Sequence, residues 1–444
     1  MSVSACPYHP GEDTPPATGP HRPAGTAELA CGYPATSCAS CETANRAEAR
    51  FCRGCGVPQT PPDYTKLSER VLAGIWDDAV DGRTPEPYTI RLPEESGSVT
   101  AIGRAGGFLL VGTDQGEVIS FNGFSPGNWC ERVSLRGSVV GFSEWRGGYG
   151  NSIMGEVPPG VVVTTASGLF HLPFGMAEQS SPFWQPGNGR RLTVGSVAMG
   201  DRLLAFPSDV ERTSPVLVCI RREGGSEAVS LEVSLALPMS APITLGDGRV
   251  AFLGDGLAVI VEPDAPHPAV TVRLAYTPDP VALPSASETD LFYVYQKGDY
   301  RGVARLGMDD WTSYRVTAPD FATLQVVAIS RKAICIGTGD DFALLSARDG
   351  TVLRSRRIHQ NVDNFSHDRF PPLRVGEYLL VCTTSRKGQP YLEIVPLSAT
   401  GFDSGLHEVL RLESLEVAPV VVPGGVVVAG ARGSGLTVLR ARSA

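Results

Sequence analysis

The sequence has no long apolar run, and its first 20 residues do not read as a secretory leader. Its most apolar tract, VAPVVVPGGVVVAG at residues 417–430, is interrupted by Pro423 and two glycines, so it falls short of the roughly 20 residues that a membrane helix needs. We interpret this tract as two buried strands. Residues 1–20 contain neither a basic segment nor a continuous apolar segment, which a secretory signal peptide would require. We therefore expect a cytoplasmic protein without membrane insertion.

The chain also lacks an excess of basic residues. Its formal net charge is −9 and its pI is about 5.4, so it has no general attraction to nucleic acid phosphates or to anionic lipids. Residues 1–62 contain four arginines against five acidic residues. They offer no basic stripe and no aromatic platform on which bases would stack. The sequence therefore argues against nucleic acid as a partner.

Motifs of the common enzyme classes are absent as well. The chain contains no G-x-S-x-G nucleophile elbow and no P-loop. The segment most similar to a catalytic cluster is HQNVDNFSHDRF at 359–370, in which the possible metal ligands are His359, Asp363, His367 and Asp368. Their spacing matches no metal site of known chemistry. We interpret the segment as a solvated loop between two strands, and we expect a protein that is not an enzyme.

Glycine and proline are abundant. The chain has 50 Gly and 36 Pro among 444 residues, which favours short strands and many turns over long helices. A chain of this length exceeds what one compact core usually holds, so we expect either two domains or one large repeat architecture.

Six of the ten cysteines lie within the first 55 residues. In CASCETANRAEARFCRGCG, residues 38–56, Cys38 pairs with Cys41 and Cys52 pairs with Cys55, each as C-x-x-C. Two such pairs can direct four thiolates to one point, and this tetrahedral sulfur site fits Zn²⁺ best. Four thiolates leave no open coordination position, so we expect a structural zinc. An iron–sulfur cluster and a redox dithiol are the alternatives, although the second needs a βαβ pattern that is absent.

The two pairs differ in their neighbours. Gly54 and Gly56 allow a tight turn whose backbone N–H groups point at the sulfurs, whereas the first pair has Ser40 and Glu42 at these positions. The residues between the pairs are long enough for a turn and a short strand. Residues 36–58, ending in FCxxCG, resemble a small bacterial zinc ribbon. The resemblance implies a metal-stabilised module. Zinc ribbons often contact nucleic acid, but the slightly acidic balance of residues 1–62 favours docking to a protein.

A second metal site is less clear from the sequence. Its possible ligands are Cys6, His9, His21 and Cys31. The alternative is a disordered tail at residues 1–35, because residues 1–62 hold 10 of the 36 prolines and few large apolar residues. The remaining cysteines lie in separate, mostly apolar segments, and we expect them to be free thiols: Cys130, Cys219, Cys335 and Cys382.

A helix is predicted at residues 65–81, within a linker at 59–86. Apolar residues recur there at three- and four-residue spacing, including Leu72, Ile75 and Trp76. Gly82 and Pro85 mark its end. One interpretation is that the helix packs on the following domain. The alternative is an exposed docking helix with Trp76 as its anchor.

From residue 87 to residue 444 a unit of short strands and turns recurs every 40 to 55 residues, which is the period of a β-propeller blade. The predicted inner strands begin near Val99, Val139, Val194, Ala241, Val281, Val326, Pro372 and Ala418. The last unit lacks an outer strand, and YTIRLPEE from residue 88 can supply it. We therefore predict an eight-bladed β-propeller at 87–444, closed by this strand, with seven blades as the alternative.

The segment ALLSARDGTVLRS at 343–355 resembles a repeat of the PQQ-like, or quinoprotein-type, propeller family. Asp349 and Gly350 make the turn between its strands, while Arg354 replaces the tryptophan that commonly ends the motif. GTDQGEVISFNG at 112–123 is a weaker example. The chain lacks the adjacent cysteine pair of a quinoprotein dehydrogenase. The resemblance therefore implies the fold and no PQQ cofactor.

Together these features favour a non-enzymatic adaptor or scaffold in a multiprotein assembly. The propeller would present one surface to protein partners and the zinc ribbon a second on a flexible arm, so that the two contacts gain from multivalency. Two alternatives remain at this point. One is an enzyme or ligand sensor with a pocket in the propeller channel, and the other is a zinc ribbon that binds nucleic acid.

Overall fold

The computed structural model shows a mainly β chain that divides into two compact units. Unit 1 contains Met1–Asp78, Pro85–Gly187 and Leu415–Ala444, and unit 2 contains Ala79–Thr84 and Asn188–Ser414. The residues that the structure describes are 35–46, 52, 54–55, 63–83, 85–124, 126, 129–145, 160–173, 181–187, 189–199, 202–208, 217–221, 228–231, 242–254, 256–262, 269–279, 282–288, 290–307, 309–317, 325–330, 332–337, 341–357, 372–384, 390–397, 410–411, 415, 417–429 and 435–442.

Among these residues the structure has one α-helix, α1 (Tyr64–Val80), close to the predicted 65–81. Its start is capped because the carboxylate of Asp63 accepts a hydrogen bond from the backbone N–H of Lys66 at 3.1 Å. Just after its end, Gly82 adopts a φ of 71°, a left-handed conformation that glycine takes easily. Both ends of the helix therefore follow from local sequence signals.

One face of α1 packs on the sheets of unit 1, which confirms the packing interpretation. Leu72 is fully buried. The Ser68 hydroxyl donates a hydrogen bond to the carbonyl of Val421 at 3.3 Å and accepts one from the Arg104 guanidinium at 2.8 Å. Trp76 is half-buried on the same helix. The apolar face is shorter than predicted, because Val80 at the helix end is 50% exposed.

The described residues of unit 1 form three antiparallel sheets of three or four strands. In order of pairing their strands are β4 (Val99–Ala105), β5 (Phe108–Thr113), β6 (Glu117–Asn122) and β7 (Trp129–Ser134); β8 (Val139–Trp145), β9 (Gly160–Thr165) and β10 (Gly168–Pro173); and β3 (Glu86–Arg91), β35 (Gly435–Arg440), β34 (Gly425–Ala429) and β33 (Val417–Val422). A short hairpin of β1 (Ala35–Ser37) and β2 (Ala44–Arg46) and the 3-10 helix η1 (Glu94–Ser96) complete the unit.

The pairing of β3 with β35 joins segments from the two ends of the predicted propeller. The two strands are antiparallel, with Glu86 opposite Arg440 and Arg91 opposite Gly435. The Arg440 guanidinium also lies over the Tyr88 ring, 4.6 Å from its centroid. The sequence prediction that the segment from residue 88 completes the last sheet is therefore confirmed. The two buried strands predicted in residues 417–430 are β33 and β34.

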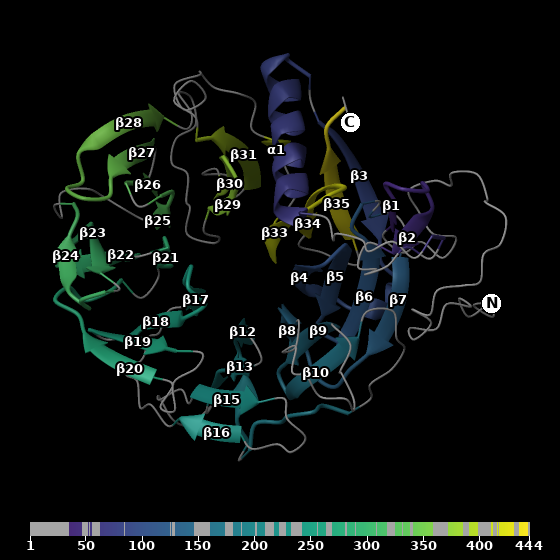
Figure 1. Cartoon of the computed structure of the whole chain (residues 1–444), viewed down its shortest axis with the longest axis horizontal. Helices are drawn as coiled ribbons and strands as arrows, with labels where there is room; N and C mark the ends of the chain where they lie inside the picture. Colours follow the sequence, from purple (N-terminus) through teal and green to yellow (C-terminus); the bar gives the residue numbers. More distant parts are fainter. Residues whose placement is uncertain are drawn as a thin grey trace. The chain divides into compact units, whose positions relative to one another are not determined.

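Unit 2 contains five four-stranded antiparallel sheets among its described residues. Their strands, each set in order of pairing, are β12 (Val197–Met199), β13 (Arg202–Ala205), β15 (Leu217–Arg221) and β16 (Ala228–Leu231); β17 (Ile243–Thr244), β18 (Val250–Gly254), β19 (Leu257–Val261) and β20 (Ala269–Arg273); β21 (Ser285–Ala286), β22 (Asp290–Lys297), β23 (Tyr300–Gly307) and β24 (Ser313–Arg315); β25 (Gln325–Ala328), β26 (Ala333–Gly337), β27 (Asp341–Ser346) and β28 (Val352–Arg357); and β29 (Leu373–Val375), β30 (Tyr378–Thr384), β31 (Pro390–Pro396) and β32 (Leu410–Arg411). The labelled strands of these sheets can be followed in Figure 1. Strands β11 (Arg191–Leu192) and β14 (Pro207–Ser208) form a further pair.

The cores lie between successive sheets. Within unit 2, one cluster joins Leu253 of β18 to Tyr293 of β22, and the next joins Phe292 of β22 to Ile336 of β26. Every residue of the middle strands β5, β9 and β18 is buried. A strand that is covered on both faces needs apolar or small residues at every position, which explains runs such as FLLVGT and VAFLG.

The strand positions agree with the repeat pattern. Eight sheets contain three or four described strands. In seven of them the first strand begins at Val99, Val139, Val197, Ile243, Ser285, Gln325 or Leu373, and in the sheet that β3 completes, β33 begins at Val417. Each lies within four residues of its predicted start; the largest difference, from 281 to 285, is in the fifth. Short turns and burial on both faces made these strands recognisable in the sequence.

Candidate metal centre

The first cysteine pair lies in the turn of the β1–β2 hairpin. Ser37 and Ala44 are the last residues opposite each other, and the turn carries Cys38 and Cys41 between them. It is closed by the backbone N–H of Cys38, which donates to the Thr43 carbonyl at 3.0 Å, and by that of Glu42, which donates to the Cys38 carbonyl at 2.8 Å. This turn points two thiols away from the strands toward the second pair.

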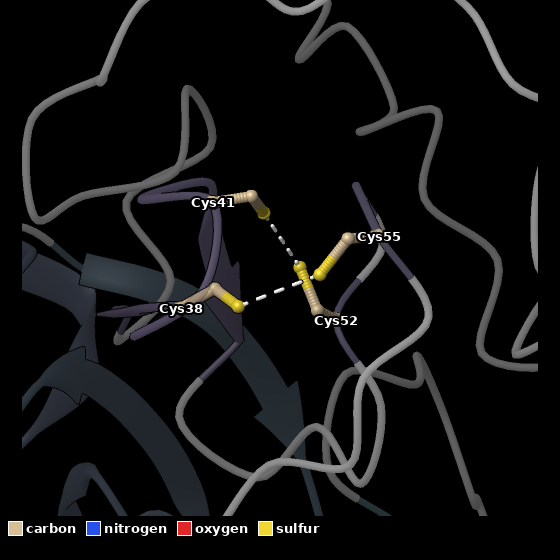
Figure 2. Close-up of side chains that lie close together, drawn as sticks. All are labelled: Cys38, Cys41, Cys52 and Cys55. Atoms are coloured by element: carbon tan, nitrogen blue, oxygen red, sulfur yellow. Dashed lines mark hydrogen bonds between the residues drawn. The ribbon is translucent and has the colours of Figure 1, made fainter.

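The four sulfurs converge on one point. Figure 2 shows Cys38 facing Cys55, with 3.6 Å between their Sγ atoms, and Cys41 facing Cys52, with 3.5 Å between theirs. All four Sγ atoms lie within 4.8 Å of one another. A tetrahedral zinc site with Zn–S bonds of about 2.3 Å places its sulfurs about 3.8 Å apart. The four cysteines therefore fit a metal ion such as zinc.

Backbone and side-chain N–H groups surround these sulfurs. Ser40 N–H donates to Cys38 Sγ at 3.4 Å, and Gly54 N–H donates to Cys52 Sγ at 3.3 Å. The Asn45 amide donates to the same Cys52 Sγ at 3.4 Å and to the Thr43 carbonyl at 2.8 Å. Such donors stabilise thiolates and hold the ligands in place around a metal.

The same contacts lower the pKa of two thiols. For Cys38, the hydrogen bond from the Ser40 backbone is the largest cause, and the pKa falls to about 6. For Cys52, burial raises the pKa, but the hydrogen bonds from the backbones of Cys55 and Gly54 and from Asn45 outweigh this effect and lower it. The hairpin therefore favours the thiolate form, which is the form that binds metal.

The two halves of the centre differ in their local backbone. Glu42 adopts a φ of 58°, in the left-handed region where a residue with a Cβ atom is strained. Gly54 is needed for another reason, because a Cβ atom there would collide with the Thr43 side chain. Thr43 also accepts a hydrogen bond from Cys41 Sγ at 3.2 Å, and a metal-bound thiolate would accept one from its hydroxyl instead. Gly56 lies outside the described residues.

The hairpin is not an isolated module. Ala35 and Ala44 belong to the same hydrophobic cluster as Phe108 of β5, Val133 of β7 and Phe170 of β10. This finding differs from the expected zinc ribbon on a flexible arm, because the hairpin buries its two alanines against the sheets of unit 1. The difference arises from small residues, whose burial leaves no periodic pattern in a three-residue strand.

Other predicted sites fall outside the described part of the chain or show no cluster within it. Cys6, His9, His21 and Cys31 lie outside the described residues, as do His359, Asp363, His367 and Asp368. Among described residues, the four ribbon cysteines are the one group of three or more His, Cys, Asp or Glu side chains placed to hold a metal ion.

Cys335 and Cys382, which are buried in the sheets, are free thiols, as expected. Burial alone raises the pKa of Cys335 and of Cys382 to about 12, so both remain protonated. Cys130 is half-buried in β7, and the side chain of Cys219 lies outside the described residues. The surroundings of each cysteine thus decide its protonation state. The thiolate is favoured in the four-cysteine cluster, and the neutral thiol is favoured in the sheets.

Sequence reasoning missed Thr43 and Asn45. Asn45 is 1% exposed, although it lies in a short polar segment that reads as surface. Its side chain bridges the hairpin turn and the second cysteine pair. Its position in the sequence could have indicated this role. Asn45 lies in the strand that follows the first cysteine pair, from which a side-chain amide can reach a sulfur of the second pair.

Fold and site together describe a β-propeller protein with a cluster of four cysteines, two of them in the β1–β2 hairpin. In structural comparison, BamB from Moraxella catarrhalis, a PQQ-like β-propeller, matches 80% of this chain over 100% of its own, with a TM-score of 0.53 and 14% identity. The computationally designed Ika8 protein matches 79% of this chain over 98% of its own, with a TM-score of 0.50 and 10% identity. Structural similarity at such low sequence identity supports the fold and says nothing about function.

No protein-family model matches the sequence, and no curated protein is similar to it. In the described part of the chain, no helix is both long and apolar enough to cross a membrane.

Proposed function

We propose that this chain is a non-enzymatic scaffold that binds protein partners in a multiprotein assembly. Its platform is a β-propeller of the PQQ-like family, and its docking module is a zinc ribbon held by Cys38, Cys41, Cys52 and Cys55. The observation that carries the proposal is the convergence of four sulfurs within 4.8 Å. Four thiolates complete a tetrahedral shell, so a zinc ion there has a structural role and no position for a substrate.

The platform is an eight-bladed ring. Seven four-stranded sheets and one three-stranded sheet among the described residues support this number. The pairing of β3 with β35 supports closure, because it ties the first strand of the propeller segment to the last. A blade exposes apolar faces on both sides until its neighbours cover them, so closing the ring is what completes the core.

Protein, and not nucleic acid, is the partner class. The net charge of −9 opposes binding to phosphates, and residues 1–62, which include the zinc-ribbon segment, hold four arginines against five acidic residues. The fold carries no PQQ in this proposal. A reducing compartment such as the cytoplasm suits the chain, because the thiols must stay reduced to bind zinc.

The test is purification of the tagged chain from its native cells, with zinc quantified and bound proteins identified by mass spectrometry. The full chain is compared with Cys52→Ser, and Cys130→Ser serves as a matched control that removes one thiol outside the cluster. We expect Cys52→Ser alone to lose both zinc and a defined set of partners. Retention of every partner by the zinc-free variant would remove the docking role from the ribbon. Absence of any stable partner from all three proteins would contradict the scaffold function.

A further inference from the structure

Residues 351–355 of unit 2, a turn residue followed by the first four residues of β28, are exposed on both faces. All five residues are exposed, including Val352 at 47% and Leu353 at 49%. Other edge strands behave differently. In β3, Ile90 is buried between exposed Thr89 and Arg91, which is the normal alternation of a half-covered strand. Exposure of two successive large apolar side chains in β28 is therefore unusual and costs solvation free energy.

Strand β28 also has an open edge. It is the last strand of its sheet, paired with β27 on one side, and no other described strand pairs with its second side (Figure 1). The pairing of β27 with β28 shifts register between Leu344 and Leu345. Arg354 lies opposite Leu344 and Val352 lies opposite Leu345, so Leu353 between them has no opposite residue on β27. An open edge presents a row of backbone donors and acceptors on which an extended peptide can add a strand.

A rigid aromatic residue lies on β24, the last strand of the preceding sheet. The turn before β28 packs closely on the preceding sheet, because a Cβ atom on Gly350 would collide with the Val316 carbonyl, one residue beyond β24. Tyr314 of β24 is 40% exposed, and its hydroxyl donates a hydrogen bond to Asp310 at 2.6 Å. The Arg305 guanidinium lies 5.0 Å from its ring centroid. An exposed tyrosine that is already fixed loses little entropy on binding, as an interface anchor should.

The charge of the surface selects among possible occupants. Arg315 and Arg354 are exposed, and the β28 sequence VLRSRR contains three arginines and no acidic residue, although Arg357 lies opposite Asp341. A second copy pairing edge to edge would oppose arginines to arginines, which is destabilising. Nucleic acid would use the arginines but neither the apolar pair nor the backbone edge. An acidic peptide with apolar residues uses all three.

We propose that β28, together with Tyr314 and Arg315 of β24, is a docking surface for an extended acidic peptide segment that adds a strand to the sheet. Alternate residues of this segment are apolar and contact Val352 and Leu353. Its acidic residues face Arg315 and Arg354. The surface is separate from the metal centre, so the inference goes beyond the docking role proposed for the zinc ribbon.

The test uses the full chain and a fluorescent synthetic peptide of about eight alternating Val and Glu residues. Fluorescence anisotropy gives the affinity. Probes for the competing occupants are the same peptide with Lys in place of Glu and a single-stranded oligonucleotide. We expect saturable binding of the Val/Glu peptide alone, with hydrogen-exchange protection of amides in 351–355. Leu353→Asp and Arg354→Glu should each weaken binding about tenfold or more.

Leu373→Asp is the matched control, because Leu373 is a 39% exposed apolar residue of another sheet in the same unit. It should bind like the unmodified chain, and so should Cys52→Ser. Tyr314→Ala, which leaves β28 intact, should weaken binding even if a β28 variant fails to fold. Absence of saturable binding up to about 1 mM peptide, equal affinity for the Lys peptide, or competition by the oligonucleotide would overturn the proposal. Loss of zinc-dependent partners with peptide binding retained would affect the ribbon function alone.

Discussion

The β1–β2 hairpin, which carries two of the four clustered cysteines, and the sheet that contains β18 are stabilised in different ways. The hairpin has two strands of three residues and buries the small side chains of Ala35 and Ala44. In the sheet, every residue of VAFLG is buried. Burial of one large apolar side chain contributes about 1.5 to 3 kcal/mol, against about 0.8 kcal/mol per buried CH₂ group. The sheet can therefore be stabilised by its core, whereas in our proposal a metal ion supplies the stabilisation that the small core of the hairpin lacks.

This difference also explains where thiol chemistry is found. In another sheet, Cys335 of β26 belongs to a buried apolar cluster, and burial raises its pKa to about 12. In the four-cysteine cluster, the backbone N–H groups of Ser40 and Gly54 donate hydrogen bonds to the sulfurs of Cys38 and Cys52. A cysteine that packs as a hydrophobe and a cysteine whose thiolate is stabilised are distinguished by the hydrogen-bond donors around them.

The largest effect should come from removing the strand that completes a sheet. Deletion of residues 84–93 removes β3 and the buried side chains of Ile90 and Leu92. We expect a loss of about 4 kcal/mol or more in the unfolding free energy of unit 1, measured by urea denaturation. Thr89→Ala, at an exposed position of the same strand, should change stability little. A deletion variant with the full melting temperature would contradict closure through β3.

The next effect should be confined largely to the hairpin. Cys52→Ser removes one ligand, so we expect loss of zinc and rapid hydrogen exchange of residues 35–46. Because Ala35 and Ala44 share a cluster with the unit 1 sheets, unit 1 should lose a further ~1–2 kcal/mol. Calorimetry and hydrogen exchange measure the two parts. Unchanged exchange in the hairpin after zinc loss would show that its fold does not depend on metal.

Metal retention should depend on pH in a way that separates hairpin from sheet. The folded hairpin lowers the pKa of Cys38 from 9.0 to about 6. Between these values the folded state binds fewer protons than the unfolded state, so this stabilisation is present at high pH and is lost as the pH falls through about 6. Zinc release, followed with a colorimetric chelator, should rise over the same range. Release that is constant from pH 8 to pH 5 would contradict the thiolate assignment.

The smallest effect should be a gain. Glu42 holds a φ of 58° in the hairpin turn, so Glu42→Gly should relieve strain and stabilise the zinc-bound hairpin by about 1 kcal/mol. Glu42→Ala is the matched control, because it removes the charge but keeps the Cβ atom. Competition with a zinc chelator measures both variants. Equal gains from Gly and Ala would assign the effect to charge and not to backbone strain.

Much of the fold could be predicted because the signals are local. Strands buried on both faces are apolar at nearly every position, and turns carry Asp–Gly pairs, so the starts of eight sheets were found within four residues. Helix α1 begins at the cap Asp63 and ends before Gly82, both readable in the sequence. The pairing of β3 with β35 was predictable because the last unit lacked a strand that the first segment could supply.

What the sequence did not predict depends on contacts between distant residues. The position of Asn45 beside Cys52 depends on how the hairpin folds over the second pair. The packing of Ala35 and Ala44 against the sheets leaves no pattern, because alanine is common on surfaces too. The buried polar residues Ser68 and Asp78 of α1 are explained by partners in other segments, the carbonyl of Val421 and the backbone N–H of Arg442.

The most direct test of this account is X-ray absorption spectroscopy at the zinc edge on the purified full chain, with metal content measured in parallel. The account predicts one zinc per chain with four sulfur ligands at about 2.3 Å, and no zinc in Cys52→Ser. Iron with bridging sulfide, nitrogen or oxygen ligands in place of sulfur, or a metal-free chain with a folded hairpin would contradict it.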